Sequence, residues 1–220
     1  QDNARGSKTS LFLDRKCRVS MTSPRDMDDE VGEAISAFKS GRPVMIYDSD
    51  YREMETDLLW HAAAATPEVI RRLRNDCGGL LFLAIGNEIG EMFGLPWLQD
   101  IHSHKSLVEE NPVLGHLVTN DLQYDSRSAF TLSLNHRETY TGITDRDRSL
   151  TTRRFGELSE ELIGKGEDGA RAKERLGKEF RTPGHIPVCR ESPGGLKTRQ
   201  GHTELVVSIA RLAGLTACTI

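Results

Sequence analysis

The chain has 220 residues, a formal net charge of −4 at pH 7 and a sequence pI near 6.0, which gives no electrostatic footprint for binding DNA or RNA. No apolar run reaches the length of a membrane span, so we expect a soluble protein that binds neither nucleic acid nor membrane. The four cysteines are far apart without a Cys-x-x-Cys pair. This spacing argues against a disulfide framework or a structural zinc site and favours a reducing, cytoplasmic compartment.

The first 28 residues are polar and partly basic and show neither a signal-peptide pattern nor the spacing of a folded element. We expect residues 1–28 to be a disordered or expression-derived extension, with a transit-like leader as the alternative. From Asp28 to Gly41 apolar residues recur at helical spacing and a glycine ends the pattern, which predicts the first helix. No Pro-, Ser- or Gly-rich linker divides the remainder, so residues 29–220 are predicted to form a single domain.

Residues 48–57 (DSDYREMETD) carry five carboxylates and one arginine. They come directly after Val44–Tyr47, an apolar run that predicts a buried strand. If residues 53–57 are extended, their three carboxylates share one face and Arg52 lies on the other. The carboxylate face could then hold a hard cation, and Arg52 could bind an anion bidentately. A solvated acidic loop explains the composition equally well.

Helical and strand-like segments alternate through the middle of the chain. Thr66-Pro67 predicts a helix start, with the threonine as N-cap, and the helix runs to about Asn75. Leu80–Ile85 is an apolar run short enough to be a strand buried on both faces. The following segments are broken helical pieces at 88–105, an unassigned stretch at 107–124 and an alternating, half-exposed strand at 129–136. Strand, helix and strand units of this kind predict the α/β class.

The C-terminal third begins with a helix that Thr144 or Asp145 could cap. Its early turns carry hydroxyls and arginines, so it is either a phosphate-binding helix start or an ordinary charged helix. Its charged, glycine-containing continuation predicts a surface insertion at 164–177. The segments after it are a turn at 180–185 (FRTPGH), a strand at 186–189, a last helix that ends at Gly214, and a strand that begins at Leu215. The apolar face of that last helix is predicted from Leu205, Val206, Ile209, Leu212 and Ala213.

The segment RQGHTE, residues 199–204, opens this last helix with the parts of a phosphate site. Gly201 lets the backbone approach a ligand, Thr203 offers a hydroxyl beside free N–H groups, and Arg199 adds charge. His202 could be a metal ligand or simply a histidine at a helix start. His185, after Pro-Gly, could carry function or lie on the surface as an ordinary turn residue.

Taken together, DSDYREMETDL, GGL, TGITDRDRSLT, FRTPGH and RQGHTE occur in an order that resembles 3,4-dihydroxy-2-butanone-4-phosphate synthase, most closely its archaeal single-domain form. The resemblance implies an α/β fold of the α+β type, a three-layer sandwich whose mixed β-sheet is flanked by helices, and a homodimer with active sites at the subunit interface. It implies a riboflavin-pathway lyase that uses Mg²⁺ or Mn²⁺. Its reaction converts ribulose 5-phosphate to 3,4-dihydroxy-2-butanone 4-phosphate and formate through a metal-stabilised enediolate and a skeletal rearrangement.

The same resemblance implies roles for individual residues. Arg52, Glu53 and Asp57 match substrate-contacting positions, and Glu53 and His202 match the two protein ligands of the metal. His185 matches the histidine essential for catalysis, and Glu53 is the second catalytic candidate. The positions that match the phosphate-binding loop are Arg199, Gln200, Gly201, His202 and Thr203.

The chain also departs from the family pattern. Tyr51 stands where an acidic residue is usual, Met54 replaces a small or polar residue, and Phe82 stands where a cysteine is often found. The family's catalytic glutamate belongs to a Cys-Glu pair after the strand that begins at Leu215, and the printed sequence ends at Ile220, before that pair. The sequence is therefore either incomplete or that of a protein that has lost this group. The alternatives to the lyase are a catalytically impaired phosphosugar-binding homologue and another metal-dependent sugar-phosphate isomerase or aldolase.

Overall fold

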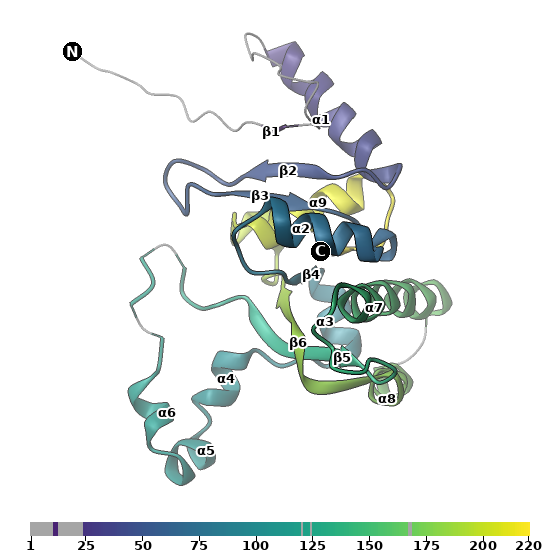
Figure 1. Cartoon of the computed structure of the whole chain (residues 1–220). Helices are drawn as coiled ribbons and strands as arrows, with labels where there is room; N and C mark the ends of the chain where they lie inside the picture. Colours follow the sequence, from purple (N-terminus) through teal and green to yellow (C-terminus); the bar gives the residue numbers. More distant parts are fainter. Residues whose placement is uncertain (1–10, 13–23, 120, 124, 167–168) are drawn as a thin grey trace, which may run out of the picture.

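The computed structural model describes residues 11–12, 24–119, 121–123, 125–166 and 169–220, which contain both helices and strands (Figure 1). The strands are β1 Leu11–Phe12, β2 Val44–Tyr47, β3 Thr56–Leu59, β4 Leu83–Ile85, β5 Phe130–His136, β6 Phe180–Arg190 and β7 Cys218–Thr219. The α-helices are α1 Pro24–Lys39, α2 Pro67–Asp76, α3 Asn87–Phe93, α4 Leu98–His102, α5 Lys105–Glu110, α6 Val113–His116, α7 Asp145–Lys165, α8 Gly169–Glu179 and α9 His202–Leu212. Two short 3-10 helices are η1 Ala62–Ala64 and η2 Gly195–Lys197.

The smaller sheet is antiparallel, in the order β1-β2-β3. Tyr47 of β2 pairs with Thr56 of β3, so the acidic stretch is the connection between two paired strands. Buried Val44 and Ile46 of β2 belong to a hydrophobic core with α1 and α9. The strand predicted at Val44–Tyr47 is confirmed, and this pairing fixes both ends of the acidic loop.

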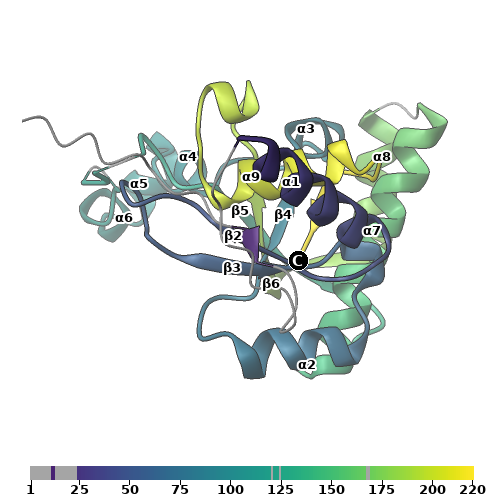
Figure 2. The same ribbon diagram turned by 90° about the horizontal axis from the view of Figure 1, so that it is seen from above.

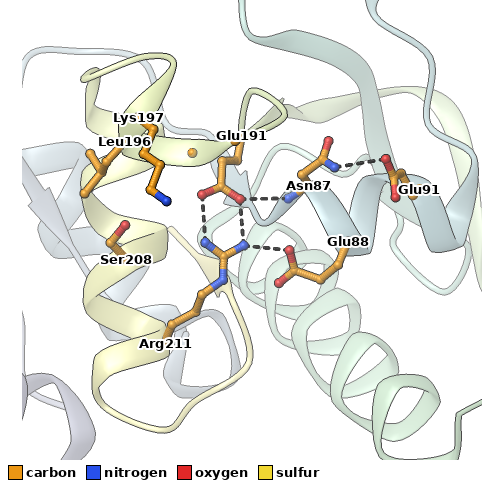
Figure 3. A pocket seen from close by; sticks show the side chains of 10 residues that line it. Asn87, Glu88, Glu91, Glu191, Leu196, Lys197, Ser208 and Arg211 are labelled. Atoms are coloured by element: carbon orange, nitrogen blue, oxygen red, sulfur yellow. Dashed lines mark hydrogen bonds and ion pairs between the residues drawn. The ribbon is translucent and has the colours of Figure 1, made fainter.

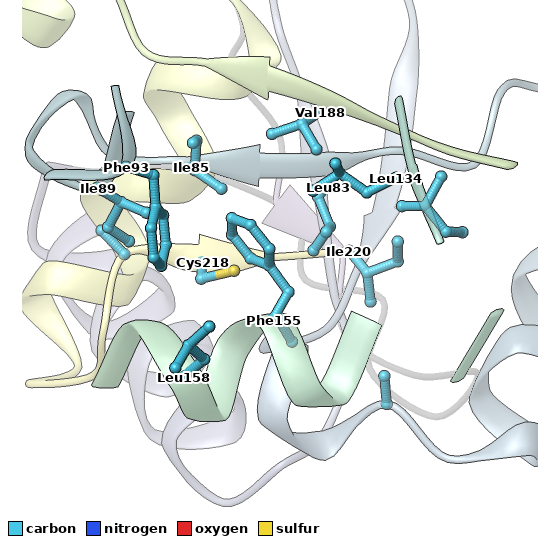
Figure 4. Packing of buried hydrophobic residues seen from close by; sticks show 14 of the residues in the cluster. Leu83, Ile85, Ile89, Phe93, Leu134, Phe155, Leu158, Val188, Cys218 and Ile220 are labelled. Atoms are coloured by element: carbon cyan, nitrogen blue, oxygen red, sulfur yellow. The ribbon is translucent and has the colours of Figure 1, made fainter. Parts of the chain in front are cut away.

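The larger sheet is mixed, in the order β5-β6-β4-β7, with β4 parallel to β6 and the two outer pairs antiparallel. In β4, Leu83 and Ile85 face a core that contains Phe155 of α7 (Figure 4), whereas Ala84 belongs to the core that contains Val206 of α9. Successive residues of a strand face opposite sides of the sheet, so helices cover both faces. Figure 2 shows α1 and α9 on one side of the strands and α2 on the other. The predicted α/β class with a mixed sheet is confirmed.

Both predicted helix caps are present. The hydroxyl of Thr66 accepts a hydrogen bond from the Val69 N–H at 3.2 Å, and that of Thr144 accepts one from the Asp147 N–H at 3.1 Å. Asp147 in turn accepts hydrogen bonds from the backbone N–H groups of Thr141 and Gly142. The carboxylate of Asp147 thus already binds the free backbone N–H groups next to the start of α7. This favours the ordinary capped helix over a phosphate site.

Three sequence-based assignments are wrong. Residues 164–177 are not a surface insertion, because most of them belong to α7 and α8, and Ala172 is fully buried in the core. Residues 180–185 are not a turn but the first half of the long strand β6, since they pair with β5. The predicted apolar face of α9 includes Leu212, which is 65% exposed, and omits Val207 and Ala210, which are fully buried.

The N-terminal prediction is only partly covered by the described residues. Leu11 pairs with Ile46 in the small sheet, and α1 begins at Pro24, four residues before the expected start. Apart from Leu11 and Phe12, the residues before Pro24 lie outside the described ranges, and the extension stays a prediction there. The described cysteines, Cys77, Cys189 and Cys218, are free. None of the helices among the described residues is both long and apolar enough to cross a membrane.

Candidate active site

The acidic loop folds around Asp48, the first residue after β2. Its buried carboxylate accepts hydrogen bonds from the backbone N–H groups of Glu53 at 2.9 Å and Glu55 at 3.2 Å. Burial acts to raise the pKa of Asp48, but these backbone hydrogen bonds outweigh it and lower the pKa below its ordinary value. Met54 has a φ of 55°, so the chain turns between Glu53 and Glu55. The single extended carboxylate face expected from the sequence is therefore wrong.

His202 begins α9 and lies against this loop. Its Nδ1 atom is 3.2 Å from a carboxylate oxygen of Glu53 and 3.8 Å from one of Asp57. Its Nε2 atom is 3.1 Å from the backbone carbonyl oxygen of Glu55. The fold thus brings together Glu53 and His202, the two predicted metal ligands, which are 149 positions apart in the sequence. Asp48, Glu53 and His202 each offer one ligand atom, and these atoms lie within 4.8 Å of one another.

The hydrogen bonding of His202 fits a bound cation. A carbonyl oxygen only accepts, so Nε2 carries the hydrogen that is donated to Glu55. In the neutral ring Nδ1 then directs a lone pair at the carboxylate of Glu53, and two acceptors at 3.2 Å need a positive charge between them. That charge is either a proton on Nδ1 or a metal ion. Carboxylate oxygens with one oriented imidazole suit Mg²⁺ or Mn²⁺ more than a closed zinc site.

Asp57 adds to this cluster a carboxyl group whose pKa is raised rather than lowered. Burial raises the pKa of Asp57, and although His202 opposes this shift, the nearby carboxylates Glu53, Glu55 and Asp48 reinforce it. A carboxyl group with a raised pKa can exchange a proton closer to neutral pH than an ordinary one. The cluster therefore combines candidate metal ligands with a candidate proton carrier.

Two arginines meet beside the cluster on one carboxylate. Both guanidinium groups hydrogen bond to Asp125: Arg52 contacts both of its oxygens at 3.3 and 3.2 Å, and Arg199 contacts Oδ2 through Nε at 3.0 Å and Nη2 at 2.8 Å. Arg199 also donates to Glu204 at 2.6 Å, and Arg52 lies 3.6 Å from the carboxylate of Glu53. The candidate cation site and an anion-binding pair of arginines are therefore neighbours.

The remaining residues of the RQGHTE segment lie at the start of α9. Gly201 is the N-cap residue, and a Cβ atom there would overlap the guanidinium group of Arg199. Thr203 is buried in the first turn, and Gln200 is exposed just before the helix. Gly201 thus allows the close approach of an arginine to the backbone, and the predicted approach of a ligand stays a prediction.

His185 lies apart from this cluster. It is in the middle of β6, where its backbone N–H donates to the Asn135 side-chain oxygen at 2.8 Å and its Nδ1 accepts from the Asn135 amide at 3.0 Å. Four residues further along β6, the thiol of Cys189 is close enough to Arg199 and Asp57 for their charges to act on its pKa. At about 3.3 Å per residue, His185 is roughly 13 Å from that point. Among the described residues, no contact joins His185 to the Glu53 and His202 cluster.

Four residues of this region were given no individual role from the sequence: Asp48, Asp125, Asn135 and Glu204. Asp48 is the first residue after a strand, where an aspartate commonly bonds nearby backbone N–H groups, so a signal was available. Glu204 occupies the third position of α9, a usual place for a glutamate. Asp125 follows the unassigned stretch and Asn135 is one polar residue of an alternating strand, so neither had a local signal.

A separate hollow of about 440 Å³ lies between α3 and α9 (Figure 3). Arg211 bridges it, donating to both oxygens of Glu191 at 2.7 and 2.6 Å and to Glu88 at 2.6 Å. Glu191 also accepts from the backbone N–H of Asn87. None of the predicted site residues lines this hollow, and its Arg211, Glu88 and Glu191 already pair with one another, so the chemistry is better placed at the Glu53 and His202 cluster.

Comparison with known proteins identifies the family. The family model of 3,4-dihydroxy-2-butanone 4-phosphate synthase matches residues 32–220. The chain belongs to this family. It is 40% identical over 190 residues to the synthase of Methanothermobacter thermautotrophicus, which covers 86% of this chain and 78% of that protein. It is 41% identical over 185 residues to the synthase of Archaeoglobus fulgidus, with 83% and 74% covered.

Solved structures of 3,4-dihydroxy-2-butanone 4-phosphate synthases share the fold. A crystal structure of a cation-free form superposes with a TM-score of 0.62 at 27% identity, and one in complex with two magnesium ions superposes with 0.62 at 26%. Each alignment covers 86% of this chain and 72% of the other. The magnesium complex shows that a synthase of this fold binds magnesium ions.

Proposed function

We propose that this chain is a lyase that converts D-ribulose 5-phosphate to L-3,4-dihydroxy-2-butanone 4-phosphate and formate in riboflavin biosynthesis. Membership of the synthase family supports the reaction. The observation in this chain that carries the proposal is the adjacency of the Glu53 and His202 cluster to the paired guanidinium groups of Arg52 and Arg199. A sugar phosphate needs both, because its hydroxyl and carbonyl oxygens suit a cation and its phosphate suits arginines.

The side chains have separable tasks in this proposal. Glu53 and His202, with Asp48 beside them, would hold Mg²⁺ or Mn²⁺, which supplies positive charge next to the substrate oxygens. Arg199 and Thr203, with Gln200 and the backbone at Gly201, would hold the phosphate at the start of α9. Arg52, which meets Arg199 on Asp125, would contact the phosphate from the side of the cation.

Proton transfers need groups that reach the carbon skeleton. Asp57, whose pKa burial raises, and the carboxylate of Glu53 would move protons on the cation side. His185 accepts a hydrogen bond at Nδ1, so its neutral ring carries the hydrogen on Nε2 and could donate it in a hydrogen bond to a substrate oxygen. This assigns the catalytic role of His185 to one defined ring atom.

The separation of His185 from the cluster supports a homodimer. Within one chain the His185 ring bonds Asn135 of β5, and among the described residues no hydrogen bond or ion pair links it to Glu53, His202 or Arg199. We propose that His185 of one protomer completes the site of its partner, as the family resemblance implies. The cytoplasmic location and the choice between magnesium and manganese stay predictions.

The activity is tested by incubating the purified chain with ribulose 5-phosphate and MgCl₂ and measuring formate. Glu53→Ala and His202→Ala are each expected to abolish metal-dependent formate release, because each removes a proposed ligand. Glu55→Ala is the matched control, since only its backbone carbonyl contacts His202 and its side chain is exposed. Full release by His202→Ala would exclude the two-ligand site. Binding of ribulose 5-phosphate without formate would indicate a phosphosugar-binding homologue, and a different product identified by NMR would indicate an isomerase or aldolase.

A further inference from the structure

Asp125 holds an unusual position between Arg52 and Arg199. Its side chain is only 8% exposed, although it comes from an irregular stretch just before β5 rather than from a helix or strand. Four N–H groups of the two arginines converge on its two oxygens at 2.8 to 3.3 Å. These hydrogen bonds overcome the effect of burial and lower the pKa of Asp125, so it is an anion at neutral pH.

The donor pattern around Asp125 is the pattern that a phosphate takes. Arginine forks bind carboxylate and phosphate oxygens in the same bidentate way. A phosphate monoester carries about −1.5 to −2 charges at neutral pH, more than the single charge of Asp125, and it has three terminal oxygens rather than two. The two arginines therefore form an anion site that a carboxylate can occupy and to which a phosphate, with more charge and one more oxygen, binds more tightly.

Glu204 contacts the same arginine in a different manner. It lies in the first turn of α9, is fully buried, and accepts from the backbone N–H of Ser192 at 2.9 Å as well as from Arg199 at 2.6 Å. Asp125 has no such second anchor among the described residues, because the hydrogen bonds of its carboxylate come from Arg52 and Arg199. The hydrogen bond to Ser192 holds Glu204 in place, so Glu204 fixes the position of Arg199. The carboxylate of Asp125 can be displaced from the two arginines without disturbing a helix.

We propose that Asp125 is an internal competitor of the substrate: it occupies the phosphate position between Arg52 and Arg199 in the ligand-free protein, and the incoming phosphate displaces it. This inference rests on the proposed function, because that function makes the two arginines substrate contacts. Asp125 keeps two guanidinium groups oriented and offsets part of their charge when the site is empty. Its displacement makes the site selective for a dianionic phosphate over singly charged carboxylates.

The competition between Asp125 and phosphate can be measured as a change in the apparent dissociation constant of phosphate. The apparent dissociation constant of a ligand equals its intrinsic value divided by the fraction of protein whose site is open. If Asp125 holds the arginines about nine-tenths of the time, removal of its charge tightens phosphate binding about tenfold.

The test uses Asp125→Asn, which keeps the size of the side chain and removes its charge. Binding of inorganic phosphate, measured by calorimetry without metal, is expected to tighten about tenfold, and the KM for ribulose 5-phosphate to fall. Asp121→Asn removes the same charge from an exposed position four residues earlier and is expected to change neither value. Glu204→Gln is expected to act in the opposite direction and weaken phosphate binding, because it loosens Arg199.

Unchanged or weaker phosphate binding by Asp125→Asn would overturn the proposal and make Asp125 a permanent support of the arginines. A second measurement needs no variant: saturating phosphate should speed backbone hydrogen exchange in the wild-type peptide that contains Asp125, because the contact is released. No change in exchange would also overturn it. Formate release by the wild type tests the proposed function separately, since phosphate binding is measured without turnover.

Discussion

At the scale of single residues, Asn135 decides how His185 is presented. Asn135 is buried, and its amide bonds both the backbone and the ring of His185, so it fixes the ring orientation and the hydrogen on Nε2. We expect Asn135→Ala to lower kcat for formate release about tenfold or more, a part of the 10²–10⁴-fold that a positioned acid–base group contributes. Inorganic phosphate binding should be unchanged, because Arg52 and Arg199 lie elsewhere. An equal loss in kcat and in phosphate affinity would show a general disturbance instead.

Asn135→Asp tests the hydrogen bond to the His185 ring more specifically than Asn135→Ala. It keeps an acceptor for the His185 backbone N–H but replaces the donor to Nδ1 with a second acceptor. The hydrogen of the ring is then drawn to Nδ1, and Nε2 loses it. The variant should fold normally and show an altered pH profile of kcat. A profile identical to that of the wild type would contradict the assigned role of Asn135.

At the scale of elements, the pairing of β5 with β6 depends on one glycine. A Cβ atom on Gly184 would overlap the backbone of Leu134 in β5, and that backbone cannot rotate away as a side chain can. Gly184→Ala should lower the free energy of unfolding by about 3 kcal/mol, the upper part of the range for overpacking. Gly177→Ala is the matched control, because Gly177 lies within α8 with open space around it, and there alanine should stabilise by about 0.5–1 kcal/mol. Urea unfolding measures both, and equal values would contradict the steric argument.

At the scale of the whole molecule, buried histidines connect stability to pH. His61 is 8% exposed, and its Nε2 bonds the carbonyl oxygen of Thr216 near β7. Burial lowers the pKa of His61 below its unfolded value of about 6.5, so the unfolded chain binds the proton more readily than the folded one. The free energy of unfolding should therefore fall as the pH drops through about 6.5, by at most about 1.4 kcal/mol per pH unit for one histidine.

Urea unfolding between pH 5 and pH 8 measures this effect. His61→Gln should show a shallower pH dependence than the wild type, because the titrating group is gone while an amide donor remains. Some dependence should persist, since burial also lowers the pKa of His136. Parallel curves for the two proteins would exclude His61 as a source of the dependence.

The sequence predicted what depends on neighbours in the chain. The strand at Val44–Tyr47 and the caps Thr66 and Thr144 follow from local apolar pattern and hydrogen-bonding chemistry, and the structure has them. Helix α8 was missed because its composition is charged and glycine-containing, although it carries Ala172 into the core. Its helical form is stabilised by packing against α3 and β6, which no local pattern records.

The residues of the candidate site also differ in how far the sequence could predict them. Glu53 and His202 could be paired in advance only because the whole set of motifs resembles a known family. Asp125 could not, because its importance comes from two arginines 73 and 74 positions away. The residues next to Asp125 in the sequence do not indicate its contacts with these arginines.

The distance in sequence between Glu53 and His202 also bears on how the protein becomes functional after synthesis. The two side chains close a loop of 149 residues, and the entropy of such a closure must be overcome by the packing of the segments between them. Contacts of this kind arise late, after the local helices and hairpins. A refolding chain should therefore regain its circular dichroism before it regains any affinity for divalent ions, and a nascent chain on the ribosome should be inert towards them until α9 has emerged and docked.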